Sequence, residues 1–196
     1  GILHSIGLGH AGNYNSSGTY ANDAEFENDS WQTTIMSYWP QGSLDGWSSI
    51  NTNNGSTSGC YLSTPMACDW IALDDIYNSY SGVGVSTAFE GNTVYGFNTN
   101  INTSTSDIFN KLSTHIQTTA YTIIDGTGDD TLDFSGFTNN TAIDLRASEK
   151  ASTTLNASSI AGKIGNLIIA AGTVIENAIG GGGNETITGN SANNNL

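Results

Sequence analysis

Two histidines near the start of the chain have a spacing that zinc sites use. His4 and His10 enclose the segment HSIGLGH, which matches the later part of the zinc motif H-E-x-x-H-x-x-G-x-x-H. In that motif the first two histidines share one face of a helix, and the glycine ends the helix so that the chain turns and brings the third histidine to the metal. The first histidine would precede Gly1, and Gly1 itself stands where the glutamate belongs. Two histidines at this spacing also occur by chance, so the segment alone leaves both interpretations open.

Two segments rich in glycine and acidic residues could bind calcium. Residues 125–134 (DGTGDDTLDF) and 180–188 (GGGGNETIT) each approximate the nonapeptide G-G-x-G-x-D-x-U-x, in which U is apolar. The glycines permit a tight turn, acidic side chains and exposed carbonyls bind calcium between successive turns, and U packs inward. Plain solvated loops are the alternative, but two copies that each end in an apolar residue favour a calcium site. The second copy carries Glu185 at the acidic position, which leaves its calcium affinity open.

The charge of the chain agrees with a cation as its partner. Its 196 residues include 18 Asp and Glu against four Lys and Arg, for a formal net charge of -14. No Lys or Arg precedes Lys111, so binding to nucleic acid or to an anionic membrane through a basic patch is excluded as a main function. No apolar run approaches the roughly 20 residues of a membrane span. Cys60 and Cys68 lie close enough in sequence for a disulfide and are too few for a tetrahedral zinc site by themselves.

The residues with possible chemistry lie on two differently built parts of the chain. Residues 1–82 are irregular, with a predicted helix over Gly1–Leu8 and a second one that begins at Ser63-Thr64-Pro65. Apolar residues three and four apart predict one buried face of the second helix, made of Met66, Trp70, Leu73, Tyr77 and Tyr80. From about residue 83 short β-type runs alternate with Gly, Asn and Asp turns, at Thr93–Tyr95, Ala120–Ile124 and Leu167–Ala170. The sequence therefore predicts two domains, 1–82 and 83–196, of which the second is all-β.

Several motifs in a fixed order resemble one protein family. Residues 34–39 (TIMSYW), together with 7–15 (GLGHAGNYN), strongly resemble the serralysins, which are secreted, calcium-containing zinc proteases of the metzincin group. The resemblance continues through residues 65–80, 92–98 (NTVYGFN), 133–137 (DFSGF) and 175–181 (IENAIGG), and so covers nearly the whole chain. It implies an α+β chain in which the C-terminal part of a metzincin catalytic domain precedes an all-β, calcium-binding parallel β-roll, or β-sandwich, domain.

The resemblance also implies roles for single residues in the first domain. His4 and His10 would be zinc ligands, Met36 would form the turn beneath the metal, and Tyr38 would be an extra zinc ligand or a catalytic donor to the transition state. The reaction would be hydrolysis of peptide bonds in protein or peptide substrates by metal-activated water. Core packing is the alternative role for Met36 and Tyr38. We further expect a secreted, extracellular monomer that does not bind nucleic acid or a membrane.

For calcium, the resemblance points to oxygen atoms in three stretches of the second domain. The expected calcium ligands are Gly91, Thr93, Asp125, Gly128, Asp130, Glu176, Gly181, Gly183 and Asn184. The resemblance extends to Asp129 and Asp133, for which a solvated acidic loop is the alternative.

Compared with the family, the chain lacks the N-terminal half, the first histidine and the general-base glutamate. We therefore expect a protease fragment with an incomplete active site, whose partner is the missing N-terminal half. A non-catalytic calcium-binding β-roll module for folding, export or adhesion is the alternative function.

Overall fold

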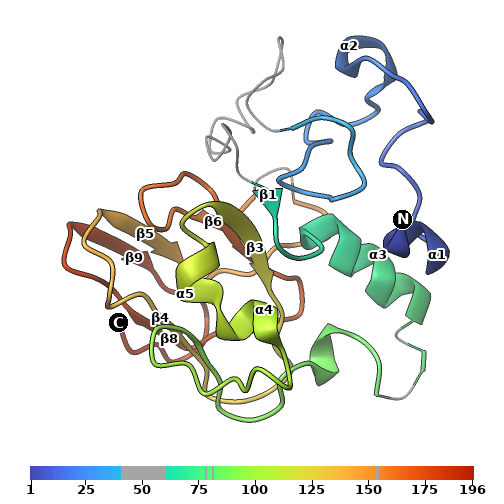
Figure 1. Cartoon of the computed structure of the whole chain (residues 1–196). Coiled ribbons are helices and arrows are strands. Elements are labelled where there is room, and N and C mark those ends of the chain that lie inside the picture. The colour runs from blue at the N-terminus through green and yellow to red at the C-terminus, as the bar shows by residue number, and fades with distance from the viewer. Residues whose placement is uncertain (41–60, 78, 81, 153–154) are drawn as a thin grey trace.

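A computed structural model describes residues 1–40, 61–77, 79–80, 82–152 and 155–196 (Figure 1). Its helices are α1 (Ile2–Ser5), α2 (Tyr20–Asp23), α3 (Ala67–Tyr77), the 3-10 turn η2 (Val85–Thr87), α4 (Asp107–Asn110) and α5 (Leu112–His115). Its strands are β1 (Tyr61–Leu62), β2 (Val94–Gly96), β3 (Thr119–Ile123), β4 (Thr131–Asp133), β5 (Thr141–Asp144), β6 (Ala157–Ser158), β7 (Leu167–Ile169), β8 (Asn177–Ile179) and β9 (Glu185–Thr188). The described chain is mostly β with few helices, and α1, α2 and α3 lie together on one side of the strands (Figure 1).

Most of the strands pair in parallel, in successive sets of strands that we call courses. β3, β4 and β5 follow one another along the chain, and β7, β8 and β9 then pair with them in the same order and direction. β1 and β2 are earlier parallel neighbours of β3 and β4, whereas β6 runs antiparallel to β7. Because each course is hydrogen bonded to the one before it, the turns between strands stack as well. Residues 125–130 are thereby brought beside residues 91–93, where Gly91 N–H donates to the Thr127 carbonyl at 2.6 Å.

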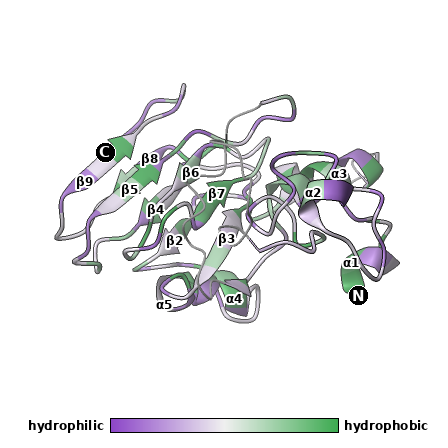
Figure 2. Ribbon diagram, turned by 90° about the horizontal axis from the view of Figure 1, so that it is seen from above, coloured by the Kyte–Doolittle hydropathy of each residue, from purple (hydrophilic) through white to green (hydrophobic). Residues whose placement is uncertain are grey.

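Both faces of the β3–β7 pair are covered. Tyr121 and Leu167 are fully buried in the main hydrophobic core, which lies on one face. Ala120 and Ile168 lie one position along the same strands and pack on the other face against Met66, just before α3. Burial of each large apolar side chain contributes about 1.5–3 kcal/mol. Figure 2 shows the hydrophobic residues concentrated on the strands and the hydrophilic ones on the turns.

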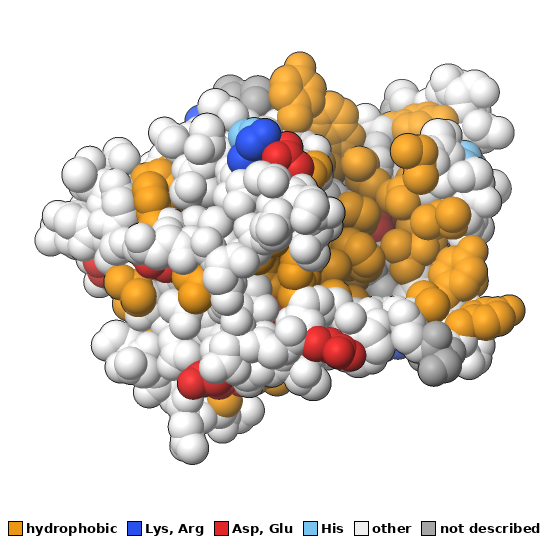
Figure 3. Space-filling view, turned by 60° about the horizontal axis from the view of Figure 1, so that its bottom comes forward, with side chains coloured by type: hydrophobic (Ala, Val, Ile, Leu, Met, Phe, Trp, Pro, Cys, Tyr) orange, Lys and Arg blue, Asp and Glu red, His pale blue; other side chains and the backbone are white. Residues whose placement is uncertain are grey.

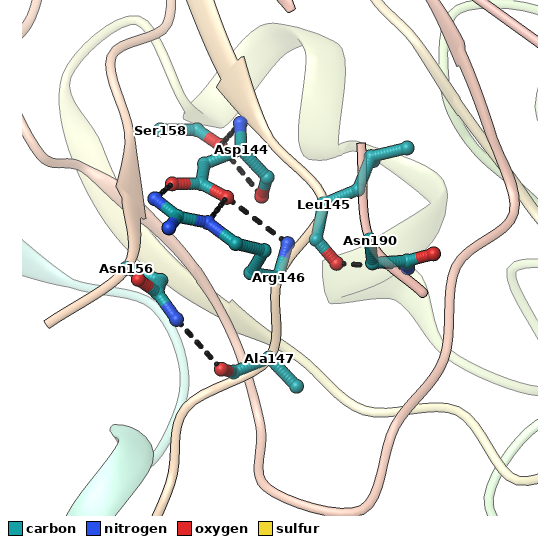
Figure 4. Close-up of polar contacts among 7 residues, drawn as sticks. All are labelled: Asp144, Leu145, Arg146, Ala147, Asn156, Ser158 and Asn190. Carbon is teal, nitrogen blue, oxygen red and sulfur yellow. Dashed lines mark hydrogen bonds and ion pairs between the residues drawn. The ribbon is translucent and has the colours of Figure 1, made fainter. Parts of the chain in front are cut away.

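Side-chain hydrogen bonds hold the chain at the end of β5 (Figure 4). The Arg146 guanidinium folds back onto both carboxylate oxygens of Asp144, at 2.9 and 2.6 Å, and the Ser158 hydroxyl accepts the Asp144 N–H at 2.8 Å. The Asn190 amide donates to the carbonyl of Leu145 at 3.1 Å, so the C-terminal segment is attached to the same place. The Arg146 side chain is exposed, and an exposed pair of this kind contributes less than about 1 kcal/mol.

The second predicted helix exists but is shorter and is capped differently. It was expected to begin at a Ser63-Thr64-Pro65 cap, but Thr64 instead accepts the Thr122 N–H of β3 at 2.8 Å. The cap comes from Asp69, whose carboxylate reaches back to the Met66 N–H at 2.8 Å. The expected face is fully buried only at Met66; Trp70, Leu73 and Tyr77 are half-buried, and Tyr80, beyond the end of α3, is 63% exposed.

The expectation of an all-β second domain needs one correction, because α4 and α5 lie between β2 and β3. Ser106 caps α4 by accepting the Phe109 N–H, and Phe109, Leu112 and Ile116 are buried in the main core at helical spacing. The three predicted strands are found within one residue of their expected limits, as β2, β3 and β7. The predicted helix over Gly1–Leu8 is reduced to α1, since Gly7 has a φ of +104° that a helix cannot contain.

Candidate metal sites

The two candidate zinc histidines lie side by side next to Tyr38. The left-handed turn at Gly7 folds the chain back after α1, so the ring centroids of His4 and His10 are 4.8 Å apart. The Tyr38 ring lies 4.6 Å from that of His10. His4, His10, Met36 and Tyr38 line one cavity of about 400 Å³. The glycine thus does what the motif predicts, and the structure brings these candidate residues together.

A hydrogen bond determines which nitrogen of His10 is available to a metal. Nδ1 of His10 lies 2.6 Å from the Met36 carbonyl oxygen, which can only accept, so Nδ1 carries the proton. Nε2 is left with its lone pair, and a histidine ligand held in this way by its other nitrogen is typical of metal sites. Desolvation lowers the pKa of His4, which favours the neutral form that binds metal.

Aromatic side chains surround Tyr38. Its hydroxyl accepts the backbone N–H of Ser16 at 2.8 Å, and its ring lies 4.7 Å from the ring of Tyr14. The Tyr14 hydroxyl lies within hydrogen-bond distance of both carboxylate oxygens of Asp29, at 3.1 and 2.9 Å, and donates to this carboxylate inside the protein. Desolvation raises the pKa of Asp29, and it also raises the pKa of Tyr14. The hydrogen bonds to Asp29 therefore hold the Tyr14 ring in place against the rings of His10 and Tyr38.

Met36 lines the same cavity as this cluster and is 8% exposed. The two expected roles of Met36, turn residue and packing residue, are both compatible with this position. The turn is attached to α3, because the Asp69 carboxylate accepts the Thr34 hydroxyl at 2.6 Å and the Ile35 N–H at 2.8 Å. Cys68 N–H also donates to the Thr33 carbonyl at 2.8 Å.

The first cluster fits part of a zinc site. A zinc ion in a protease takes three protein ligands and a water, and the chain offers two imidazoles and a phenol here. Across the described ranges, no group of three or more His, Cys, Asp or Glu side chains could hold a metal ion. The remaining histidine, His115 at the end of α5, contacts the Tyr121 hydroxyl of β3 at 3.2 Å.

The candidate calcium residues at the turn after β3 also converge. Asp125 and Asp130 are each 1% exposed, and Asp130 accepts the Thr93 N–H at 2.7 Å. Asp125 accepts the Tyr95 hydroxyl on Oδ2 at 2.6 Å, but its Oδ1 is buried without a hydrogen-bond partner. Desolvation, opposed by the Tyr95 bond and reinforced by the charge of Asp130, raises the pKa of Asp125 to about 7. Desolvation likewise raises the pKa of Asp130.

The lack of a side chain at Gly128 lets two oxygen atoms approach the turn that carries Asp125 and Asp130. A Cβ atom at Gly128 would lie 2.6 Å from Asp130 Oδ1 and 2.6 Å from the Gly91 carbonyl oxygen, so only glycine lets these two oxygens approach the turn. A buried carboxylate oxygen without a donor, beside a second buried carboxylate and a carbonyl, is a donor set that suits calcium. These oxygens therefore fit part of a calcium site, which takes about six to eight oxygen ligands in all.

The other acidic residues of this region differ in their surroundings. Glu176 accepts the Asp130 N–H at 2.8 Å, which places it next to the same turn. Asp129 is exposed and accepts the Asn177 side-chain amide at 2.7 Å. Asp133 is buried, but its two oxygens already accept donors from Asn98 and Ser135.

The second glycine-rich turn packs against residues 137–140. A Cβ at Gly183 would lie 2.5 Å from the Asn139 carbonyl oxygen, and a Cβ at Gly181 would collide with the Phe137 carbonyl oxygen. Asn184 N–H donates to the Asn140 side chain at 3.0 Å. Both carboxylate oxygens of Glu185 are buried without a partner, so this turn too holds an unpaired acidic group.

The family described as peptidase M10 serralysin C terminal matches residues 85–195. The chain belongs to this family. Metallopeptidase AprA of Pseudomonas marginalis is 38% identical over 199 residues, which cover 98% of this chain and 36% of that protein. Serralysin B of Dickeya chrysanthemi is 35% identical over 95% of this chain and 34% of its own length, and a serralysin of Photorhabdus luminescens is 36% identical over 100% of this chain and 36% of its own length. The chain thus spans about a third of the length of these serralysin relatives.

Three polar residues of this serralysin chain were missed by the sequence interpretation. Tyr14, Asp29 and Asp69 form the hydrogen bonds around the His10 and Met36 segment, but none of them stands in a metal-ligand spacing. Only Asp69 carried a signal that could have been used, because it is an acidic residue in the first turn of α3.

Two further expectations concern this serralysin chain as a whole. Among the described residues, no helix is long and apolar enough to cross a membrane. Cys60 lies outside the described residues, so its disulfide with Cys68 stays a prediction.

Proposed function

We propose that the chain is the C-terminal part of a secreted zinc endopeptidase of the serralysin type. In this proposal residues 1–82 are the last part of a metzincin catalytic domain, and residues 83–196 are a calcium-binding β-roll. The observation that carries the proposal is the meeting of His4, His10 and Tyr38 at one cavity that the buried Met36 also lines. The stacked parallel turns and the unpaired oxygen of Asp125 support the calcium-binding role.

Each residue of the cluster has a separate task. His4 and His10 would hold zinc, which when bound polarises the peptide carbonyl and lowers the pKa of its water. His10 presents Nε2 because its Nδ1 proton is held by the Met36 carbonyl. The Tyr38 ring lies 4.6 Å from the His10 ring, and its phenol would be the donor that stabilises negative charge on the carbonyl oxygen. Gly1 stands at the position of the general-base glutamate, so the test below puts a glutamate in its place.

Exposed apolar side chains on and near α1 and α3 support the proposal that an upstream region of the protein packs against this part of the chain. Ile2 is 82% exposed, Ile76 43% and Tyr80 63%. Figure 3 shows hydrophobic side chains gathered on the side of the molecule that carries α1 and α3 in Figure 1. A contiguous exposed apolar face of this kind marks an interaction site in a soluble protein. The proposed occupant is the N-terminal half of the protease.

The test restores the upstream region. A chimaera would carry the upstream region of Pseudomonas marginalis AprA, through the His and Glu that open the zinc motif, joined to Ile2 of this chain. We expect it to cleave casein, to lose activity on chelation and to recover it with zinc. His10→Ala should lower activity at least 100-fold, while His115→Ala, in the second domain, is the matched control and should leave activity unchanged.

The chimaera also has a clear negative result. A folded chimaera that binds zinc yet cleaves no peptide at any calcium concentration would contradict the protease assignment. Equal activity of the His10→Ala and His115→Ala variants would contradict the assignment of the site.

The second candidate function is a non-catalytic calcium-binding module. It is favoured by Gly1 at the position of the glutamate and by the unpaired carboxylate oxygen of Asp125. Calcium that binds only the folded chain should stabilise it by about 2.7 kcal/mol at a hundredfold excess over Kd, a rise of roughly 5–10 °C in Tm. An unchanged Tm at millimolar calcium would contradict it, and a chimaera without casein cleavage but with this rise would favour it over the protease.

A further inference from the structure

Asp69 joins the start of α3 to the turn that carries Met36. It is 2% exposed, and its carboxylate accepts from three donors. Oδ1 accepts the Thr34 hydroxyl at 2.6 Å, and Oδ2 accepts the backbone N–H groups of Ile35 and Met66, each at 2.8 Å. Two of these donors belong to the turn and one to the helix start, so a single side chain fixes the distance between the two segments.

The contacts of Asp69 continue to His10 through the turn. The Thr34 oxygen, whose proton goes to Asp69, accepts the Met36 N–H at 3.0 Å. The Met36 carbonyl in turn accepts the Nδ1 proton of His10 at 2.6 Å. Because both sides of the Met36 residue are hydrogen bonded, a shift of the turn moves the acceptor that selects the His10 tautomer.

We infer that Asp69 is a positioning residue for the candidate zinc site: its carboxylate holds the Thr34–Met36 turn, and the turn holds His10 with its proton on Nδ1. The inference rests on the proposed function, because the role matters for a zinc ligand. Asp69 does not contact the metal ligands itself, and it acts through the backbone of the turn. A carbonyl that accepts the second ring N–H of a histidine ligand orients it and raises metal affinity, and Asp69 holds the turn that carries such a carbonyl.

The geometry explains why an amide would be a poor substitute for this carboxylate. An Asn at position 69 could still accept the Ile35 and Met66 N–H groups with its single oxygen. Its NH₂ group would then face Thr34, whose oxygen has a second lone pair for it, but the Thr34 hydroxyl proton would lose its acceptor and the oxygen that accepts the Met36 N–H would be shared with a second donor. Asp69→Asn should therefore keep the helix cap while loosening the hydrogen bond that reaches Met36.

The test measures the tautomer of His10 and the binding of zinc on the 196-residue chain. Nitrogen-detected NMR of the histidine rings distinguishes Nδ1–H from Nε2–H, and His4→Ala and His115→Ala assign the three histidines. Zinc affinity is measured by calorimetry. Asp74→Asn is the matched control, because Asp74 lies on the same helix and accepts the Val85 N–H at 2.9 Å, on the side of the β domain.

We expect the Nδ1–H form of His10 to dominate in the unchanged chain and in Asp74→Asn. In Asp69→Asn the signal should move toward the Nε2–H form, and zinc should bind roughly 10- to 100-fold more weakly. A folded Asp69→Asn variant with an unchanged tautomer and unchanged zinc affinity would overturn the inference. If Asp69→Asn does not fold, Thr34→Val, which removes only the hydroxyl link, must show the same shift in tautomer or the inference fails.

These readouts separate the two proposals. If the unchanged chain and the chimaera bind no zinc, the proposed protease function fails, while a tautomer that responds to Asp69→Asn still supports the positioning role. If zinc binds but the tautomer does not respond, the positioning role fails and the zinc site stands.

Discussion

The buried carboxylate of Asp125 makes the metal-free protein pH-sensitive in a direction opposite to that of a salt-bridged acid. Its Oδ1 has no donor, and burial raises its pKa from 3.8 to about 7. The folded state therefore holds the proton more tightly than the unfolded state does. Stability from this group is fully present below the unfolded pKa and is lost as pH rises through the folded one.

The size of this loss follows from the pKa shift. One pKa unit corresponds to about 1.4 kcal/mol, so the full shift is worth roughly 4 kcal/mol above pH 7. Because the titration of Asp125 is coupled to that of Asp130, we expect about 2–4 kcal/mol to be measured. Asp29, Asp69 and Asp130 also have raised pKa values, and they act in the same direction.

The decisive variant is Asp125→Asn, which removes the charge and keeps the shape. In chelator at pH 8 it should be more stable than the unchanged chain by about 1–3 kcal/mol, after roughly 1 kcal/mol is subtracted for an imperfectly bonded amide. At pH 5 the difference should shrink. In calcium the order should reverse, because the variant loses the ligand that the cation needs.

The assay is urea unfolding at both pH values, each with chelator and with calcium. Asp129→Asn is the control, since Asp129 is exposed and hydrogen bonded to Asn177, and it should change stability by less than about 0.5 kcal/mol. An Asp125→Asn variant that is less stable than the unchanged chain in chelator at pH 8 would refute the reasoning. An equal calcium-induced gain in the variant would refute the calcium assignment.

Three further perturbations test the same domain. Asp130→Ala should lower the calcium-induced rise in Tm more than Asp129→Ala, because Asp130 is buried beside Asp125; equal losses would contradict this. Tyr95→Phe removes the donor to Asp125 and should cost about 1–3 kcal/mol in chelator, measured by urea unfolding, and no loss would show that the bond is not needed. Leu132→Ala opens a cavity at a fully buried position and should cost about 2–5 kcal/mol; a Tm within 2 °C of the unchanged chain would contradict the assignment of the core.

Local signals in the sequence predicted three of the strands, whereas the roles of the candidate ligands stay predictions. β3 and β7 are short apolar runs between turn residues, and such runs leave little choice of structure. The proximity of His4 and His10 could be predicted from their spacing, because Gly7 between them turns the chain back. The pairing of β3 with β7 could not be predicted in this way, since it depends on how many residues the intervening turns and β5 occupy.

The missed residues share a different property. Asp69 lies on α3, a helix whose predicted start was the Ser63-Thr64-Pro65 cap. Thr64 and Asp69 are both polar residues near this helix start, so either could cap it. The choice between them depends on β3, which takes the Thr64 oxygen for the Thr122 N–H, and no local pattern contains that contact. Tyr14 and Asp29 likewise pair over fifteen residues of irregular chain, where no period relates them.

The two candidate metal sites are connected through this same strand. β3 carries Thr122, which fixes the chain before α3, and it ends just before Asp125, the residue with the unpaired oxygen. A cation that relieves the repulsion between Asp125 and Asp130 stabilises the end of β3, and β3 supports the segment whose Asp69 holds the Met36 turn. Calcium bound at Asp125 and Asp130 should therefore slow local opening of the Thr34–Met36 turn.

Hydrogen exchange of the Ile35 and Met36 amides, with and without calcium, measures that effect. Equal exchange in the two conditions would show that the sites are energetically independent.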